Sequence, residues 1–298
     1  MDSYYYRSSR YRMFDDYSEP FGWWGGHWSP PVPLSVIQII ESGSMNARMV
    51  ALAWLMIERH NSLMFASEPP MAGKTTTMTA FIDFIPRDQR RIYLRGMYES
   101  FQFEEDGKGQ PPNSWLLVNE FSNHLPTYLW GPKASRAFSL LEEGYCLGGT
   151  MHADSAEEAV AQLHHELGVS DEELAQLGLL FIVRMYNTRT GRPIRDEYEM
   201  PYGSNAVLRR VATGHLLSLG DDGKLKLNLF TRWERTGDHH NLTLEPHLPL
   251  FAARTGLSVE RVIAELDKRE QYLTELCARG IHSISAVREA IDRFRHEA

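Results

Sequence analysis

The segment Ala72-Gly73-Lys74-Thr75-Thr76-Thr77 contains the residue types that bind phosphate groups. It follows a short apolar run at residues 63–66, which predicts a buried strand, and it opens a predicted helix at residues 74–85. A loop that enters a helix aims several N–H groups at one point, where the helix dipole is positive. Lysine adds a charge for the β- and γ-phosphates, and a threonine hydroxyl can ligate Mg²⁺. The segment therefore predicts a site for ATP and Mg²⁺.

The residues just before this segment depart from the usual phosphate-binding loop. Glu68 stands where the pattern has glycine, and a carboxylate there repels a triphosphate. Pro70 lacks an N–H donor, and Met71 carries a Cβ where a positive φ is expected. The donors from Met71 onward remain, so we expect weakened binding rather than none. The predicted nucleotide contacts are Met71, Ala72, Gly73, Lys74, Thr75 and Thr76, and Thr75 is the predicted Mg²⁺ ligand.

Two polar residues follow other predicted strands. The apolar run at residues 115–118 ends in Asn119-Glu120, and the run at residues 147–151 ends in His152. Carboxyl ends of parallel strands share one edge of a sheet, where a carboxylate can orient an attacking water. We expect the strand of Glu120 to neighbour the strand before the phosphate loop. The alternatives are a solvated strand-end charge for Glu120 and a hydrogen-bonded structural histidine for His152.

The chain resembles the motor domain of the type II/IV secretion-system ATPases, which drive pilus, archaellum and secretion assemblies. Residues 67–77 with their helix match this family, as does the strand end Val118-Asn119-Glu120. The most specific match is Gly149-Thr150-Met151-His152-Ala153-Asp154-Ser155, which with the residues up to Ala159 is similar to the family's histidine box. Residues 265–269 with Gly280-Ile281 resemble the tail of the Tad and archaeal branch, so the chain resembles a divergent member of it.

The resemblance implies a RecA-like P-loop α/β fold, with a mainly parallel sheet flanked by helices, that binds and hydrolyses ATP. By the resemblance, Glu120 polarises the attacking water and His152 senses or stabilises the γ-phosphate. The family forms homo-oligomeric rings, usually hexamers, which act on inner-membrane secretion or pilus-assembly proteins. We therefore expect a cytoplasmic protein that lies peripherally at the inner membrane face.

A second hypothesis is a catalytically degenerate subunit that binds nucleotide and serves a regulatory or structural role. Its basis is a set of missing family features. Residues 93–99, where the family has an acidic box, offer only Glu99, and Arg95 stands where an acid is usual. The following connection, which carries arginines in the family, is reduced to residues 104–113, and Arg136 is a weak substitute.

Composition bears on the remaining classes of function. The 298 residues include 31 basic and 39 acidic side chains, a net charge of −8, which argues against a nucleic-acid translocase. Two cysteines cannot form a disulfide framework, and no apolar run is long enough to span a bilayer.

The distribution of residue types predicts the organisation of the chain. Residues 1–32 are rich in aromatic residues and arginine, and we expect a disordered tail there. Residues 33–298 are expected to form the ATPase domain, with a β-hairpin region at about 180–235 and a helical segment at about 245–298. Asn46 is a predicted helix cap, and Asp222-Gly223 predicts the turn of the hairpin. Ser155 and Glu158 have the spacing of a helix capping box.

Overall fold

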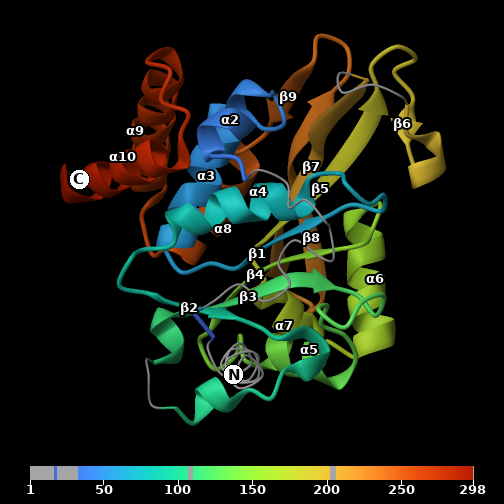
Figure 1. The fold of residues 1–298 in the computed structure, drawn as a ribbon. Coiled ribbons are helices and arrows are strands. Elements are labelled where there is room, and N and C mark those ends of the chain that lie inside the picture. The colour runs from blue at the N-terminus through green and yellow to red at the C-terminus, as the bar shows by residue number, and fades with distance from the viewer. Residues whose placement is uncertain (1–16, 19–32, 107–109, 202–205, 298) are drawn as a thin grey trace, which may run out of the picture.

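The computed structural model describes residues 17–18, 33–106, 110–201 and 206–297 (Figure 1). Its centre is a nine-stranded sheet with the strand order β2-β3-β4-β1-β5-β7-β8-β9, and β6 pairs with β5 beside this path. The strands are β1 (Leu63–Ala66), β2 (Arg90–Tyr93), β3 (Ser114–Phe121), β4 (Cys146–Met151), β5 (Leu179–Asn187), β6 (Pro193–Ile194), β7 (Val207–Leu219), β8 (Leu225–Glu234) and β9 (His239–Leu242).

Helices cover both faces of the sheet (Figure 1). The helices on one face are α2 (Val36–Glu41), α3 (Ala47–Glu58), α4 (Lys74–Phe81), α8 (Leu248–Thr255), α9 (Val259–Ala278) and α10 (Ile284–Glu297). Those on the other are α5 (Pro132–Ser139), α6 (Ala156–Leu167) and α7 (Asp171–Gln176). Among the described residues, no helix has the length and apolar character needed to cross a membrane.

The sheet has a parallel part and an antiparallel part. Strands β2, β3, β4, β1 and β5 pair in parallel, whereas β5, β7, β8 and β9 pair antiparallel. The predicted turn at Asp222-Gly223 joins β7 to β8, and Gly223 has a φ of +73°. The predicted α/β class, with helices flanking the sheet, is confirmed, and β1 lies within the parallel part.

Strand β1 is buried on both faces because it lies between β4 and β5 at the centre of the sheet. Leu63 and Phe65 pack into the core cluster that contains α3 and α4, and Met64 and Ala66 pack into the cluster that contains α5 and α6. A strand covered on both sides needs consecutive apolar residues. This is why the run at 63–66 lacks polar alternation.

A glycine in β4 allows α4 to lie close to the sheet. A Cβ added to Gly148 would lie 2.3 Å from the terminal methyl carbon of Met78, which belongs to α4. No side chain at position 148 would fit beneath this helix without displacing Met78. The close packing fixes the position of α4, and with it the loop that precedes the helix.

Helix starts follow the predicted caps, with one difference. Asn46 caps α3 through a bond from the N–H of Met49 at 2.9 Å, and Ser155 caps α6 through a bond from the N–H of Glu158 at 3.1 Å. The predicted capping box at Ser155 is wrong in its second half. The carboxylate of Glu158 accepts from the N–H of Asp154 at 2.7 Å instead of that of Ser155. The carboxylate therefore holds the segment just after β4.

Tyr17 departs from the predicted disordered tail. It is buried, its carbonyl accepts from the N–H of Tyr93, and its hydroxyl donates to the carboxylate of Glu99 at 2.7 Å. Burial, together with the charge of Glu99, raises the pKa of Tyr17 to about 12, so the hydroxyl stays protonated. Residues 1–16 and 19–32 of the predicted tail lie outside the described residues.

Tyr17→Phe is expected to lower the free energy of unfolding by about 1–2 kcal/mol, because the buried Glu99 carboxylate loses one hydrogen bond. Urea denaturation measures the change. Tyr198→Phe is the matched control, since Tyr198 is 90% exposed and its replacement should have no effect. Equal stability of both variants would contradict a structural role for Tyr17.

Candidate functional site

The loop between β1 and α4 contains two residues in the left-handed backbone region. Met71 has a φ of +60° and Gly73 a φ of +95°, and Gly73 is the N-cap of α4. A glycine cap offers no side-chain acceptor, so the first-turn N–H groups of α4 are open to an anion. The predicted positive φ at Met71 is present although the residue is not glycine. Met71 itself is 58% exposed.

Lys74 points back over this loop. Its Nζ donates to the carbonyl oxygen of Ser67 at 2.9 Å and lies 3.9 Å from Oε2 of Glu120. The side chain is only 5% exposed, and burial lowers the pKa of Lys74 to about 8 against the opposing charges of Glu120 and Glu68. The buried ammonium has lost its hydrogen bonds to water, and the N–H groups in the first turn of α4 have no side-chain cap. A phosphate at this position would accept hydrogen bonds from both.

Glu120 reaches Lys74 from two strands away. The prediction that its strand neighbours β1 is wrong, because β4 lies between β1 and β3. A β-bulge in β3 lies next to Glu120. Val118 pairs with Gly149 and Phe121 pairs with Met151, so β3 has one residue more than β4 between these two pairs. Bulges re-aim side chains at sheet edges. The carbonyl of Asn119 accepts from the hydroxyl of Thr150 at 2.7 Å, which holds the bulged segment against β4.

His152, which follows β4, links the loop to Glu120. Its Nδ1 lies 2.6 Å from the carbonyl oxygen of Glu68, and its Nε2 lies 2.8 Å from Oε1 of Glu120. A carbonyl oxygen only accepts, so Nδ1 is the donor in the shorter contact. The contact of 3.3 Å between Nδ1 and Nζ of Lys74 is then not a hydrogen bond. The three predicted side chains Lys74, Glu120 and His152 therefore lie together.

Three further residues border the site and were not predicted from the sequence. Nε of Arg209, on β7, donates to the carbonyl of Met71 at 3.0 Å. The ring of His124 lies 5.6 Å from that of His152, measured between centroids. Burial and then the charge of Glu120 raise the pKa of Tyr128 to about 12. These residues come from β7 and the β3–α5 connection, where no local pattern marks them.

Several residues considered as replacements for family features lie in structural contacts instead. Glu99 is 2% exposed and accepts from the backbone N–H groups of Arg95, Ser100 and Phe101. Arg136 pairs with Glu104 at 2.5 Å and with Glu143 at 2.9 Å. The Glu99 carboxylate therefore holds the conformation of its own loop. Arg136 is held in ion pairs with two nearby carboxylates.

The tail motif at residues 265–269 also has a structural role. Glu265 and Arg269 are buried and paired with each other, and Arg269 donates to Glu58 of α3 at 2.5 Å. The guanidinium carbon of Arg269 lies 5.2 Å from the ring centre of Trp54. The motif therefore fixes α9 to α3.

The residues present fit a nucleotide with magnesium. Oγ of Ser67 is buried next to the Lys74 contact and makes no hydrogen bond within the described parts of the chain. Thr75, in the first turn of α4, is half-buried. The described residues contain no cluster of three or more His, Cys, Asp or Glu side chains that could hold a metal. Mg²⁺ held by one hydroxyl and substrate phosphates does not need such a cluster.

Comparison with known proteins gives two uncharacterized relatives. No family model matches the chain. Uncharacterized protein MJ1287 of Methanocaldococcus jannaschii is 25% identical over 260 residues, which cover 80% of this chain and 90% of that protein. Uncharacterized protein MJ0900 of the same organism is 27% identical over 297 residues, which cover 88% of this chain and 49% of that protein. The chain thus spans about half the length of MJ0900.

Two solved structures are similar to part of the chain. The VirB11 ATPase of the Brucella suis type IV secretion system, in complex with sulphate, has a TM-score of 0.31 at 17% identity, over 47% of this chain and 52% of its own. The Legionella pneumophila ATPase DotB has a TM-score of 0.33 at 13% identity, over 60% of this chain and 48% of its own.

Met71→Gly is expected to raise the free energy of unfolding by about 0.5–1 kcal/mol. The strain of a left-handed residue with a Cβ, roughly 1–2 kcal/mol, exceeds the entropy that glycine loses on folding. Met97→Gly is the control, because Met97 is similarly exposed at 57% but has no positive φ. The free energy of unfolding of Met97→Gly should fall, because glycine loses more backbone entropy on folding. Destabilisation of both variants in thermal unfolding would show that Met71 is not strained.

Proposed function

We propose that this chain is an ATP-binding and ATP-hydrolysing motor subunit of a type II/IV secretion or pilus-assembly system. The observation that carries the proposal is the convergence of three groups at the N-terminus of α4: the ammonium of Lys74, the carboxylate of Glu120 and the imidazole of His152. Their chemistry suits phosphoryl transfer, in which positioning and charge stabilisation supply most of the catalysis.

Each group has a distinct proposed role. Lys74 exchanges its contact with the Ser67 carbonyl for the β- and γ-phosphates, and the N–H groups from Met71 to Thr76 surround them. Glu120 orients the attacking water, and His152, next to its carboxylate, contacts the γ-phosphate. Bound Mg²⁺, held by Thr75, would neutralise charge that develops on the phosphate oxygens.

The finer assignments are part of the same proposal. By the family resemblance we infer a homo-oligomeric, hexameric ring that is cytoplasmic and peripheral at the inner membrane face, where it acts on membrane-embedded assembly proteins. The Tad and archaeal branch is inferred from residues 265–269 and Gly280-Ile281.

A second candidate function is a nucleotide-binding regulatory or structural subunit without turnover. It is favoured by the structural use of Glu99 and by the ion pairs that occupy Arg136. In this candidate, no arginine of the kind found in the family contacts the phosphoryl group that is transferred. The rate of hydrolysis would then be lower by a factor on the order of 10³.

Phosphate release from Mg-ATP separates the two candidates. The native chain should hydrolyse ATP, Lys74→Ala should lose both binding and turnover, and Glu120→Gln should keep binding while its rate falls by about 10²–10⁴-fold. Glu166→Gln, an exposed carboxylate on α6, is the matched control and should match the native rate.

The outcomes of this assay are distinguishable. Binding without turnover in the native chain supports the regulatory candidate. Calorimetry that detects no ATP binding, or binding that is unchanged in Lys74→Ala, contradicts both candidates.

Nucleotide binding should also take up protons near pH 8. The pKa of Lys74 is about 8 in the free chain because of burial, and adjacent phosphate favours the charged form and raises it. Free Lys74 is half-protonated at that pH, so binding takes up about half a proton there and almost none at pH 6. Affinity should therefore fall as the pH rises above 8.

Calorimetry in buffers of different ionisation enthalpy measures the uptake. Lys74→Arg is the control, because arginine stays charged at every pH tested. Equal uptake in Lys74→Arg would show that the proton binds elsewhere.

A further inference from the structure

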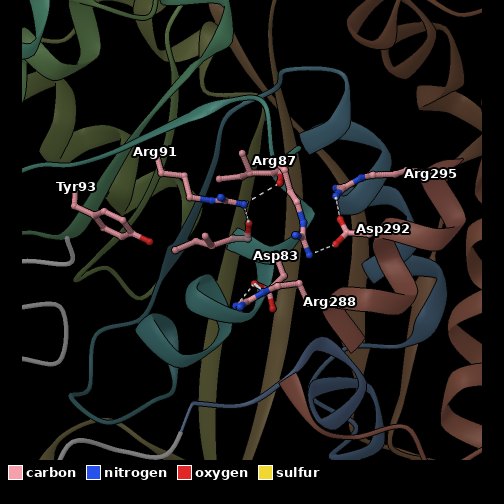
Figure 2. A pocket seen from close by; sticks show the side chains of 9 residues that line it. Asp83, Arg87, Arg91, Tyr93, Arg288, Asp292 and Arg295 are labelled. Carbon is pink, nitrogen blue, oxygen red and sulfur yellow. Dashed lines mark hydrogen bonds and ion pairs between the residues drawn. The ribbon is translucent and has the colours of Figure 1, made fainter. Parts of the chain in front are cut away.

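A pocket of about 490 Å³ lies at the opposite end of α4 from the phosphate loop (Figure 2). It is bordered by the short 3-10 turn after α4 (Ile82–Phe84), by β2 and by α10. Lys74 and Asp83 are separated by nine helical steps, or about 14 Å. The pocket is therefore separate from the candidate nucleotide site. Its charged lining residues are Asp83, Arg87, Arg91, Arg288, Asp292 and Arg295.

The charges of this lining do not balance. Four guanidinium groups face two carboxylates, which leaves a formal charge of +2. Figure 2 shows these side chains converging from β2, from the chain just before it and from α10. Burial, with smaller contributions from the nearby cations Arg288 and Arg295, lowers the pKa of Arg91. An anion in the pocket would offset the repulsion among these cations.

Not every arginine is available to a ligand. Arg295 is committed to protein contacts, since it donates to Glu58 at 2.6 Å, to the carbonyl of Phe84 at 2.6 Å and to Asp292 at 3.4 Å. Nε and Nη2 of Arg288 both donate to Oδ1 of Asp83, at 3.0 and 2.7 Å. Its Nη1 donates to none of the described residues and its side chain is 52% exposed.

Two other arginines retain donors. Arg87 pairs with Asp292 through Nη2, and its side chain is 66% exposed. Arg91 donates Nη2 to the carbonyl of Ile85 at 2.9 Å, whereas its Nε is buried without a hydrogen-bond partner in the described chain. Guanidinium forks match the oxygen geometry of phosphate. Arg87, Arg91 and Arg288 therefore offer unused donors around one cavity.

We propose that this pocket binds a phosphate-bearing anion through Arg87, Arg91 and Arg288. The phosphate belongs either to a soluble small molecule or to a phospholipid headgroup, and both present the same chemistry to the three arginines. The carboxylates of Asp83 and Asp292 hold the guanidinium groups in place. Tyr93 also lines the pocket.

The test uses the Lys74→Ala chain, so that the candidate nucleotide site cannot contribute. Calorimetry at low salt measures binding of inorganic pyrophosphate. Sedimentation with phosphatidylcholine vesicles, with and without phosphatidylglycerol, measures binding to a lipid phosphate. We expect saturable binding in one of these arms, and we expect it to weaken as salt rises.

Variants of the rim residues test the location. Arg288→Lys keeps a positive charge beside the buried Asp83 but removes the fork, and Arg87→Gln leaves Asp292 in contact with Arg295. Each, added to Lys74→Ala, should weaken binding about tenfold, the loss expected for one charge-assisted hydrogen bond. Arg189→Gln, an exposed arginine in the β5–β6 turn, is the matched control and should bind as Lys74→Ala does.

The results either support or overturn the proposal. Pyrophosphate binding assigns a soluble ligand, and binding only to anionic vesicles assigns a lipid headgroup. Absence of binding in both arms, or equal binding by all the arginine variants in chains whose unfolding transitions are intact, overturns it. The arginines would then serve only as ion pairs that fix α10 to the sheet. Since Lys74 is absent throughout, neither result depends on the proposed ATPase activity.

Discussion

The site depends on a buried positive charge. The ammonium of Lys74 is removed from water at the N-terminus of α4, where the helix dipole is also positive. Such a placement is unfavourable unless acceptors surround the charge. The Ser67 carbonyl and the Glu120 carboxylate are those acceptors, and His152 ties Glu120 to the loop through the Glu68 carbonyl. An entering phosphate would replace the carbonyl contact with a stronger one.

The geometry of this group is set by the packing of the sheet. Gly148 in β4 permits the close approach of Met78, and this places α4. The bulge in β3 turns Glu120 toward a lysine two strands away. Arg209 adds a contact from the antiparallel part of the sheet by holding the carbonyl of Met71. Strand β7 therefore supports the loop between β1 and α4, although the two segments are more than a hundred residues apart in the chain.

The C-terminal helices use charge for a different purpose. Arg269 and Arg295 both donate to Glu58, so α9 and α10 are joined to α3 through one partly buried carboxylate. Arg288 and Asp83 connect α10 to the end of α4. The same helix that begins after Met71 and Gly73 thus ends at the arginine-lined pocket. Lys74 at one end of α4 pairs with Glu120, and Arg87 and Arg288 at the other end pair with Asp292 and Asp83.

The sequence alone determined the elements whose signals are local. The apolar run at 63–66, the cap at Asn46 and the turn at Asp222-Gly223 depend on neighbouring residues, and all were predicted. The contacts of Lys74 with its loop follow from the strand–loop–helix order. Glu120 was predicted to join it because strand ends share one edge of a sheet, and His152 was predicted to join it by the family resemblance of residues 149–159.

Only the tertiary structure decided the strand order, the bulge that aims Glu120, and the contacts of Tyr17, Arg209 and Tyr128. Each of these joins segments that are distant in the chain, and a distant contact leaves no periodicity in the sequence. The role of a charged residue is likewise set by its partners. Glu99 and Arg136 have the residue types of a catalytic site, yet the charges and N–H groups that surround them in the fold make them structural.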